Sequence, residues 1–377
     1  MSGQTEFIYA QIGFEWAALS GFGLATNLLG AGHPKPKRSF PMPDRKTKPY
    51  HPRHFPNPDD PVSVGGFVVA ANNDEYAFYH SGTSQDAALL NASAKPSCPH
   101  CGSPRTESKG KTKSGARRRL CKTCGKTFTP ATGGLLSYHK LPVKTLVRFL
   151  VNILTDASVN EASKVAKISM RTAVYWLNKA FLALRGYQDS LVLSGVVYLD
   201  DKFVDVEASR KEKDRNGNLY KGSKNQWNVA IGKAGRTRIL LLQGKSKSSD
   251  RRLRKTWAGR IAEGCHLVTD GDLAYHLVAK DCKADPWTKV VFKYRHGEQC
   301  EELEPINTLS SNVEAWFRLH CGIVKTASRI QDYLNLLSFK LSCPGNALKK
   351  AGELMKMMLG SKKILRFRAE FPTNSDF

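Results

Sequence analysis

The middle of this chain alternates between short apolar runs and longer segments in which apolar residues have helical spacing. Runs rich in β-branched and aromatic residues predict buried strands. These runs cover residues 195–206, 227–232, 238–242, 266–270 and 289–294. Helices are predicted over residues 250–262 and 273–280, and a further helix from Asn312 onward. This order indicates an α/β domain with a mixed sheet flanked by helices.

Three acidic residues lie where these apolar elements have no structural need for a charge. Asp200 interrupts the first strand, Asp270 ends the fourth, and Glu314 flanks the inward face of the last helix. A carboxylate in such a position must be paired, protonated or bound to a cation. The three positions therefore indicate a site for metal-dependent phosphoryl transfer.

The sequence around these acids resembles the three blocks of DDE transposases from bacterial insertion sequences of the ISXO and Merlin-related group. The blocks here read VVYLDDKFVDV, HLVTDGDLAYH and INTLSSNVEAWF. The resemblance implies a ribonuclease-H-like catalytic domain, whose element order matches the predicted one. It also implies that Asp200 bridges two Mg²⁺ or Mn²⁺ ions, that Asp270 holds one of them, and that Glu314 holds the other. The implied activity is DNA cleavage at terminal inverted repeats and strand transfer, by a homodimer or higher assembly.

Other residues compete for two of these assignments. Asp201 follows Asp200 directly, and strand alternation sends the two side chains to opposite faces. Glu304 has a spacing from the second acid that is typical of integrases, but it lies in an acidic, proline-containing stretch with no predicted helix. Members of the family often carry Asn-Thr close before the third acid, whereas here Asn307 is seven positions before Glu314. We favour Asp200 and Glu314, and keep Asp201, Glu304 and Asn307 as alternates.

Four of the nine cysteines form two CxxC pairs separated by nineteen residues. They are Cys98, Cys101, Cys121 and Cys124. Four thiolates in two such pairs are what a structural zinc ion requires, and they fit a reducing cytoplasm better than a disulfide framework does. His100 lies inside the first pair and is expected at the surface. The segments CPHCGS and CKTCGKTF also resemble the N-terminal zinc ribbon of the same transposase group, in which the ribbon helps to bind the element ends.

The chain contains 58 basic and 33 acidic residues, a net charge of +25. The excess recurs in clusters, so nucleic acid is the expected partner. The resemblance to the transposase group implies double-stranded DNA, both element ends and target. A solvated basic surface is the alternative. In the ribbon the expected DNA contacts are Arg117, Arg118 and Arg119. In the catalytic domain, residues 244–260 carry seven basic side chains against one acidic, and Arg251 and Arg252 are the expected contacts.

A helical pattern follows the ribbon, with Pro142 at its start. A short helix over residues 160–167 and a longer one over residues 170–185 are joined through Ser169, a suitable N-cap. This arrangement is typical of a helix-turn-helix, although the usual turn glycine is absent. The side chains then expected in the major groove are Arg171, Thr172, Tyr175, Asn178 and Lys179. An ordinary helical bundle packed on the catalytic domain is the alternative.

The ends of the chain are less informative. Residues 33–56 are proline-rich and basic, and residues 66–79 predict a hairpin. A basic amphipathic helix is predicted over residues 346–368. The apolar stretch over residues 16–26 is too short to span a bilayer, and no basic segment precedes it, so we expect a cytoplasmic, nucleoid-associated protein without a membrane partner.

The predicted organisation has five parts with distinct roles: a region of unknown role, the zinc ribbon, the helix-turn-helix-like domain, the catalytic domain and the C-terminal helix. They cover residues 1–95, 96–130, 139–187, 192–343 and 344–377. Two other functions fit parts of this pattern. A DNA-binding regulator, including an inactive or domesticated transposase, needs the ribbon and helices but not the acids. A Mg²⁺-dependent nuclease needs both the DNA-binding parts and the acids, but it pairs no ends and performs no strand transfer.

Overall fold

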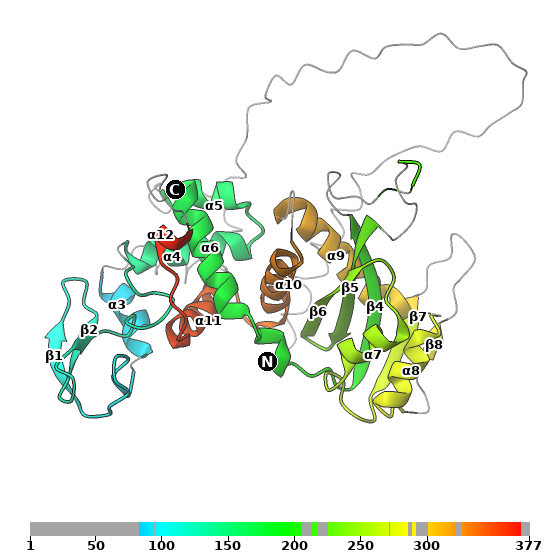
Figure 1. Cartoon of the computed structure of the whole chain (residues 1–377), viewed down its shortest axis with the longest axis horizontal. Coiled ribbons are helices and arrows are strands. Elements are labelled where there is room, and N and C mark those ends of the chain that lie inside the picture. The colour runs from blue at the N-terminus through cyan, green and yellow to red at the C-terminus, as the bar shows by residue number, and fades with distance from the viewer. Residues whose placement is uncertain are drawn as a thin grey trace, which may run out of the picture. The chain divides into compact units, whose positions relative to one another are not determined.

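The structure, a computed structural model, describes residues 83–93, 95–139, 141–205, 213, 215–217, 225–270, 272–285, 289–291, 301–320 and 326–370. These residues belong to one compact unit, Pro56–Phe377 (Figure 1). The predicted hairpin at 66–79 and the proline-rich segment at 33–56 lie outside the described residues.

The larger sheet has the strand order β6-β5-β4-β7-β8. Its strands are β4 (Val196–Asp205), β5 (Gln226–Ala234), β6 (Thr237–Lys245), β7 (His266–Asp270) and β8 (Lys289–Val291). Strand β5 pairs antiparallel with both β4 and β6, whereas β7 is parallel to both β4 and β8. The predicted mixed sheet is therefore confirmed, with β4 at its centre.

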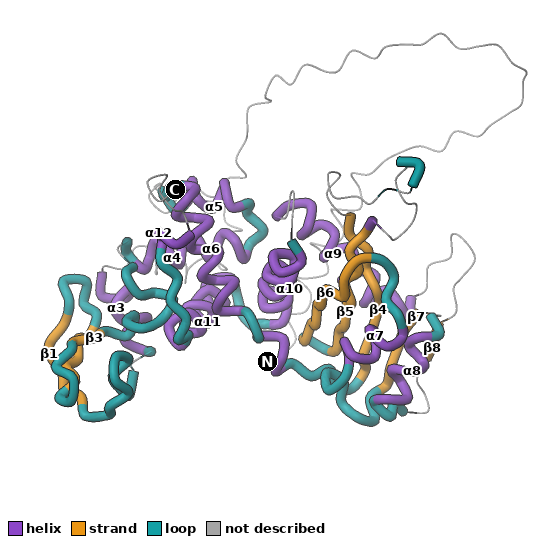
Figure 2. The backbone as a smooth tube through the Cα atoms, in the orientation of Figure 1, coloured by secondary structure: helices purple, strands orange, loops and turns teal. Residues whose placement is uncertain are grey.

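Helices cover both faces of this sheet (Figure 2). On one face, α9 (Glu304–His320) and α10 (Ala327–Ser342) pack against β4, β5 and β6. On the other face, α7 (Asp250–Trp257) and α8 (Ala274–Asp281) share a core with the odd-numbered residues of β4, such as Leu199. Side chains alternate along a strand, so the even-numbered residues of β4 face α9.

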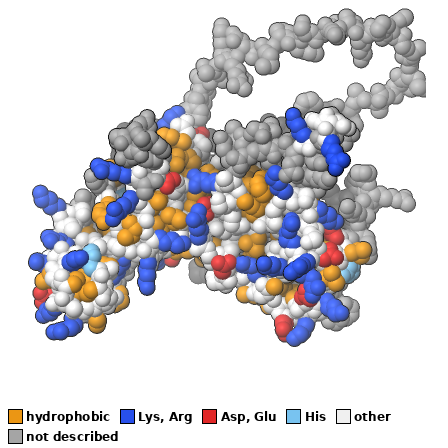
Figure 3. Space-filling view, viewed as in Figure 1, with side chains coloured by type: hydrophobic (Ala, Val, Ile, Leu, Met, Phe, Trp, Pro, Cys, Tyr) orange, Lys and Arg blue, Asp and Glu red, His pale blue; other side chains and the backbone are white. Residues whose placement is uncertain are grey.

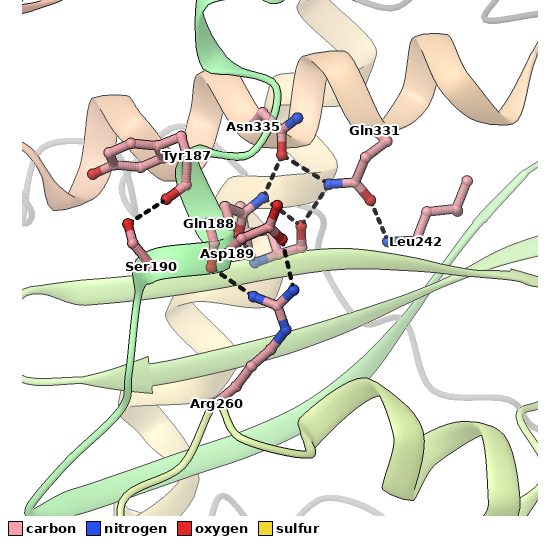
Figure 4. Close-up of polar contacts among 9 residues, drawn as sticks. Tyr187, Gln188, Asp189, Ser190, Leu242, Arg260, Gln331 and Asn335 are labelled. Atoms are coloured by element: carbon pink, nitrogen blue, oxygen red, sulfur yellow. Dashed lines mark hydrogen bonds and ion pairs between the residues drawn. The ribbon is translucent and has the colours of Figure 1, made fainter.

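The outer edge of β6 is closed by side-chain amides (Figure 4). Gln188 lies in a short 3-10 helix, η1 (Tyr187–Ser190). Its side chain accepts a hydrogen bond from the Leu240 N–H at 2.6 Å and donates one to the Leu240 carbonyl at 2.9 Å. Gln331 of α10 accepts a hydrogen bond from the Leu242 N–H at 2.8 Å. These bonds satisfy backbone groups that an open edge strand would offer to another chain.

Replacing Gln188 with alanine should lower the free energy of unfolding by about 2–3 kcal/mol, because the Leu240 N–H then stays buried without an acceptor. Urea unfolding followed by circular dichroism measures this loss. The matched control is Gln226→Ala, whose side chain makes an exposed hydrogen bond to Asp205 and should change little. Equal midpoints for the two variants would contradict the role given to Gln188.

A helical group shares one continuous core with the α9–α10 face of the sheet. It consists of α4 (Val143–Leu154), α5 (Val159–Val165), α6 (Met170–Leu184) and α11 (Ala347–Gly360). Helix α11 packs against α4 and α6, so the chain returns from the sheet to this group near its C-terminus. Across the helices of the described residues, none combines the length and hydrophobicity needed to cross a bilayer.

The two helices of the predicted helix-turn-helix form close to the expected positions. Helix α5 begins with a capping box, in which the Ser158 hydroxyl accepts from the Glu161 N–H and the Glu161 carboxylate accepts from the Ser158 N–H. Helix α6 begins after Ser169, which accepts a hydrogen bond from the Thr172 N–H at 3.2 Å. Between them, Lys167 takes a left-handed conformation with φ of 52°. A lysine thus fills the turn position where glycine is usual.

The C-terminal helix is shorter than predicted. Helix α11 ends at Gly360, residues 361–366 are not helical, and a short helix α12 (Phe367–Glu370) follows. The apolar stripe of α11 includes Met358 and Leu359. Its next positions are lysines 362 and 363, so a continued helix would have no apolar face to bury there.

Candidate functional site

The structure places Asp200 and Asp270 on neighbouring parallel strands. Strand β4 pairs with β7 in a register that sets Leu199 opposite Thr269. Asp200 and Asp270 are the next residues on their strands, and parallel neighbours in register point to the same face of a sheet. That face is covered by α9. Two acids separated by seventy positions in the sequence therefore lie side by side.

The surroundings of Asp200 orient its carboxylate and bury it near a second negative charge. Its Oδ2 accepts a hydrogen bond from Ser310 Oγ of α9 at 2.9 Å. Its Oδ1 accepts one from the Asp201 N–H at 2.8 Å. Burial raises the pKa of Asp200, and the negative charge of Asp270 raises it further. The pair is thus a partly buried anionic site that a cation would stabilise.

Glu314 lies on the same helix face as Ser310, one turn further along. Its carboxylate forms an ion pair with Lys202 Nζ at 2.7 Å and a second with Arg318. The hydrogen bond from Lys202, followed by that from Arg318, lowers the pKa of Glu314. Within the described residues, no three carboxylates place oxygens within 4.8 Å of one another. The structure therefore joins Asp200 with Asp270 but holds Glu314 in a separate ion pair.

The alternates for the third acid lie at the start of the same helix. The sequence predicted no helix around Glu304, and this was wrong: α9 begins at Glu304 and continues through Asn307 to His320. Pro305 is in the first turn, where a missing N–H costs no hydrogen bond. The side chains of Glu304 and Asn307 are exposed.

Asp201 lies on the opposite face of β4, as strand alternation requires. The Asn228 side chain donates a hydrogen bond to Asp201 Oδ2 at 3.4 Å, while Asp201 Oδ1 is buried with no hydrogen-bond partner among the described residues. The same holds for the buried hydroxyl of Tyr275 within the part of the chain that the structure describes. Burial raises the pKa of Asp201 to about 7, and the nearby charges of Asp200 and Asp270 add to the shift. Asp201 therefore belongs to a polar cluster behind the site, on the α8 side of the sheet.

Sequence reasoning missed the partners of these acids. Ser310 donates a hydrogen bond to Asp200, and Lys202 donates one to Glu314. The sequence spacing could have indicated both partners. Ser310 precedes Glu314 by four residues, which is helical spacing, and Lys202 follows Asp200 by two, which is strand spacing. Each pair therefore shares one face of its element.

The four cysteines converge at one end of a small antiparallel sheet. Its strands are β1 (Thr106–Lys111), β2 (Arg117–Cys121) and β3 (Thr127–Phe128). All four Sγ atoms lie within 4.8 Å of one another; the Cys98–Cys124 separation is 3.7 Å and the Cys101–Cys121 separation is 3.5 Å. A tetrahedron with Zn–S bonds of about 2.3 Å has S–S edges of about 3.8 Å. The cluster therefore fits a tetrahedral metal ion such as zinc.

The local chemistry agrees with this fit. Hydrogen bonds from the backbone N–H groups of Cys124 and Thr123 lower the pKa of Cys121, which favours its thiolate. The small core at this position contains Phe128 besides the cysteines. His100 is exposed and lies outside the set of four ligands. A sheet with so little apolar core would gain stability from a metal ion held by the four cysteines.

Replacing Cys121 with serine should release the metal and unfold β1–β3 while the rest of the protein stays folded, because the two large cores contain no ligand cysteine. Native mass spectrometry should find one zinc ion per wild-type chain and none in the variant. The thermal unfolding transition of the larger sheet and its helices should persist in the variant. Cys343→Ser, at a buried cysteine outside the cluster, should keep its zinc. Zinc retained by Cys121→Ser would refute the assignment.

The expected DNA contacts in the ribbon and in α7 differ in exposure. Arg117 is exposed and Arg118 is half-buried, whereas Arg119 is held by hydrogen bonds to the side chain and carbonyl of Thr106. Arg251 and Arg252 are exposed on α7. Figure 3 shows basic side chains across the visible face, with few acidic ones among them.

The outward face of α6 is largely covered, and the expectation of exposure is wrong for Tyr175 and Lys179. Tyr175 is 8% exposed and Lys179 is 1% exposed, and burial lowers the pKa of Lys179 to about 8. Asn178 donates a hydrogen bond to the Glu370 carboxylate of α12 and accepts one from Arg329. The C-terminal segment lies across this face. Of the five predicted groove contacts, only Arg171 and Thr172 are not covered in this way.

An α-helix precedes the ribbon, and the sequence did not predict it. Helix α3 (Thr83–Ala92) contacts the ribbon through Asn91, which accepts a hydrogen bond from the Arg117 N–H at 2.8 Å and donates one to the Gly115 carbonyl at 3.2 Å. Four of its apolar residues, Ala87 to Leu90, are consecutive and so do not gather on one face of the helix. Periodicity therefore gave no signal.

The chain is similar to a protein described as an uncharacterized protein in transposable element ISH50, from Halobacterium salinarum. The two sequences are 22% identical over 239 residues, which cover 59% of this chain and 78% of the relative. No family model matches the chain. The similarity to a protein from a transposable element points to a transposase-related role.

Proposed function

We propose that this protein is a DNA transposase of the DDE type, which cleaves the ends of a mobile element and joins them to a target. The observation that carries the proposal is the side-by-side placement of Asp200 and Asp270 on parallel strands. The strand order, with three antiparallel strands followed by two parallel ones, supports a ribonuclease-H-like domain as part of this proposal. The relative from a transposable element supports the same function.

Asp200, Asp270 and Glu314 would hold two Mg²⁺ or Mn²⁺ ions, which supply Lewis acidity to the attacking and leaving oxygens. The raised pKa of Asp200 supports this role, because it reflects first the burial of the carboxylate and then its repulsion by Asp270. Ser310 positions the Asp200 carboxylate through its hydrogen bond. The side chain of Asp200 is thereby fixed before DNA binds.

Lys202 connects the third acid to the substrate in this proposal. It lies on the same face of β4 as Asp200 and forms the ion pair with Glu314. A phosphate of the bound strand would attract the Lys202 ammonium away from Glu314. Glu314 would then turn toward the two aspartates and complete the set of ligands.

The remaining parts of the chain would bind and position double-stranded DNA. Zinc held by the four cysteines would stabilise the ribbon, and the exposed Arg117 would contact phosphates. Arg251 and Arg252, exposed on α7, would contact duplex flanking the cleaved strand. Strand transfer of two element ends requires that two sites be brought together, so we infer that a homodimer or larger assembly forms on DNA.

A DNA-binding regulator without catalysis is the second candidate. The observation that favours it is the ion pairing of Glu314 with both Lys202 and Arg318, which leaves the three acids apart. A regulator would use the ribbon, the helices and the net positive charge in the same way. It would bind DNA with no dependence on Mg²⁺.

The test uses a supercoiled plasmid that carries the DNA flanking the coding region on both sides. The transposase proposal expects nicked, excised and joined products that require Mg²⁺ or Mn²⁺ and both flanking segments. Binding of the same segments without any cleavage would establish the regulator. Cleavage without joined products would establish a nuclease.

A further inference from the structure

A pocket of about 650 Å³ lies between the start of α6, the loop before α4 and the C-terminal segment. Its walls combine aromatic rings with two arginines, and none of the described residues that line it is acidic. The lining residues are Tyr138, His139, Leu141, Thr172, Tyr175, Trp176, Arg366, Phe367 and Arg368. A volume of this size is typical of small-ligand sites.

Apolar side chains are unusually exposed around this pocket. Ten large apolar side chains are exposed in the described part of the chain, and five of them belong to the three segments that form the pocket. These five are Tyr138, Leu141, Met170, Ile364 and Phe367. A clustered exposed apolar surface marks a binding site rather than a chance feature of the fold.

Tyr138 is held in a conformation that its own backbone disfavours. It has a φ of 60° and is 72% exposed, so neither backbone preference nor burial explains a tyrosine at this position. The Arg366 guanidinium lies over its ring at 5.8 Å. The strained, exposed ring beside a cation indicates a functional contact.

The C-terminal wall of the pocket is fixed in place by α6. The Tyr175 hydroxyl donates a hydrogen bond to the Leu365 carbonyl at 2.7 Å. The Phe367 ring packs edge-on against the Tyr175 ring at 5.2 Å. Lys363 Nζ donates to the Leu182 carbonyl at 3.3 Å. Arg366 and Arg368 are therefore held at the mouth of a formed pocket, and their exposed side chains are available to a ligand.

We propose that this pocket binds an unpaired nucleotide of a DNA strand, with the base stacked on Tyr138 or Phe367 and the phosphate held by Arg366 and Arg368. Exposed rings interleaved with arginines are the chemistry that recognises bases outside a duplex. A base within a duplex has both faces stacked and offers no ring to such a pocket. The choice of DNA rests on the proposed function.

Tyr138→Gly separates binding from folding. Glycine accepts a positive φ without strain, so the thermal midpoint of this variant should be no lower than that of the wild type. Its affinity for a fluorescein-labelled oligothymidylate, measured by anisotropy, should fall about tenfold. Arg366→Ala should weaken binding and reduce its salt dependence. Tyr138→Phe, which keeps the ring, and Val192→Ala, at an exposed apolar residue elsewhere, should bind as the wild type does.

Two outcomes overturn the inference. Either Tyr138→Gly and Arg366→Ala bind oligothymidylate like the wild type, or a blunt duplex competes as well as the single strand. The plasmid cleavage assay tests the transposase proposal independently of this binding measurement. Loss of affinity in Tyr138→Gly with no cleavage by the wild type would retain the pocket and reject the transposase. Cleavage by the wild type, together with unchanged affinity in Tyr138→Gly, would retain the transposase proposal and reject the pocket as a nucleotide site.

Discussion

Asp200→Asn and Asp270→Asn should each lower Mg²⁺-dependent cleavage of element ends by about a thousandfold or more, while Asp201→Asn should keep most of it. The first two residues share the α9 face of the sheet, where a neutral amide would weaken cation binding. Asp201 points to the other face, toward Asn228. Initial rates of cleavage of the plasmid that carries both flanking segments, at saturating Mg²⁺, measure the difference.

The third acid has its own matched pair of variants. Glu314→Gln should abolish cleavage, whereas Glu304→Gln, at an exposed glutamate ten positions earlier on the same helix, should not. All variants should bind the flanking DNA, because none of these carboxylates is expected to hold it alone. An Asp201→Asn protein without activity, beside a fully active Asp200→Asn protein, would reverse the assignment of the first acid. Full activity in Asp270→Asn would remove the catalytic proposal.

The sheet could be predicted from sequence because its signal is local. Each strand contains a short apolar run, so its position follows from composition within a few residues. The pairing of Asp200 with Asp270 followed from the resemblance to a known family, and periodicity alone would not have given it. The register that sets Leu199 opposite Thr269 supports it with an independent observation.

The sequence could not predict contacts between residues that lie far apart in the chain, because no local pattern marks those residues. Gln188 closes the edge of β6 at a distance of 52 positions, and nothing in its neighbourhood marks it as a strand cap. The outward face of α6 is also buried by residues that lie far from it in the sequence. Tyr175 and Lys179 have the spacing of an open helix face, yet a segment 190 positions later buries Tyr175 through the Leu365 carbonyl.

The buried acid behind the site should destabilise the protein at neutral pH. Asp201→Asn is expected to raise the free energy of unfolding at pH 8 by up to about 4 kcal/mol, because the pKa of Asp201 is raised from 3.8 to about 7 in the folded protein. The amide of the variant still accepts the hydrogen bond from Asn228. Its new N–H group can also donate to Asn228 Oδ1, which accepts no hydrogen bond from the described residues.

The direction of the pH dependence follows from the raised pKa. The folded wild type keeps the Asp201 proton to a higher pH than the unfolded chain does, so its stability falls as the pH rises from about 4 to about 7. The gain from Asp201→Asn should therefore be small at pH 4, grow through this range and level off above pH 7. Urea unfolding at several pH values, in buffer without Mg²⁺ and without a chelator that removes zinc, measures the curve.

Asp250→Asn, at an exposed acid of α7, is the matched control and should change stability little at any pH. A gain in Asp201→Asn that is equal at pH 4 and pH 8 would show that the carboxylate is not buried in its charged form, and that the polar cluster on the α8 side is open to water.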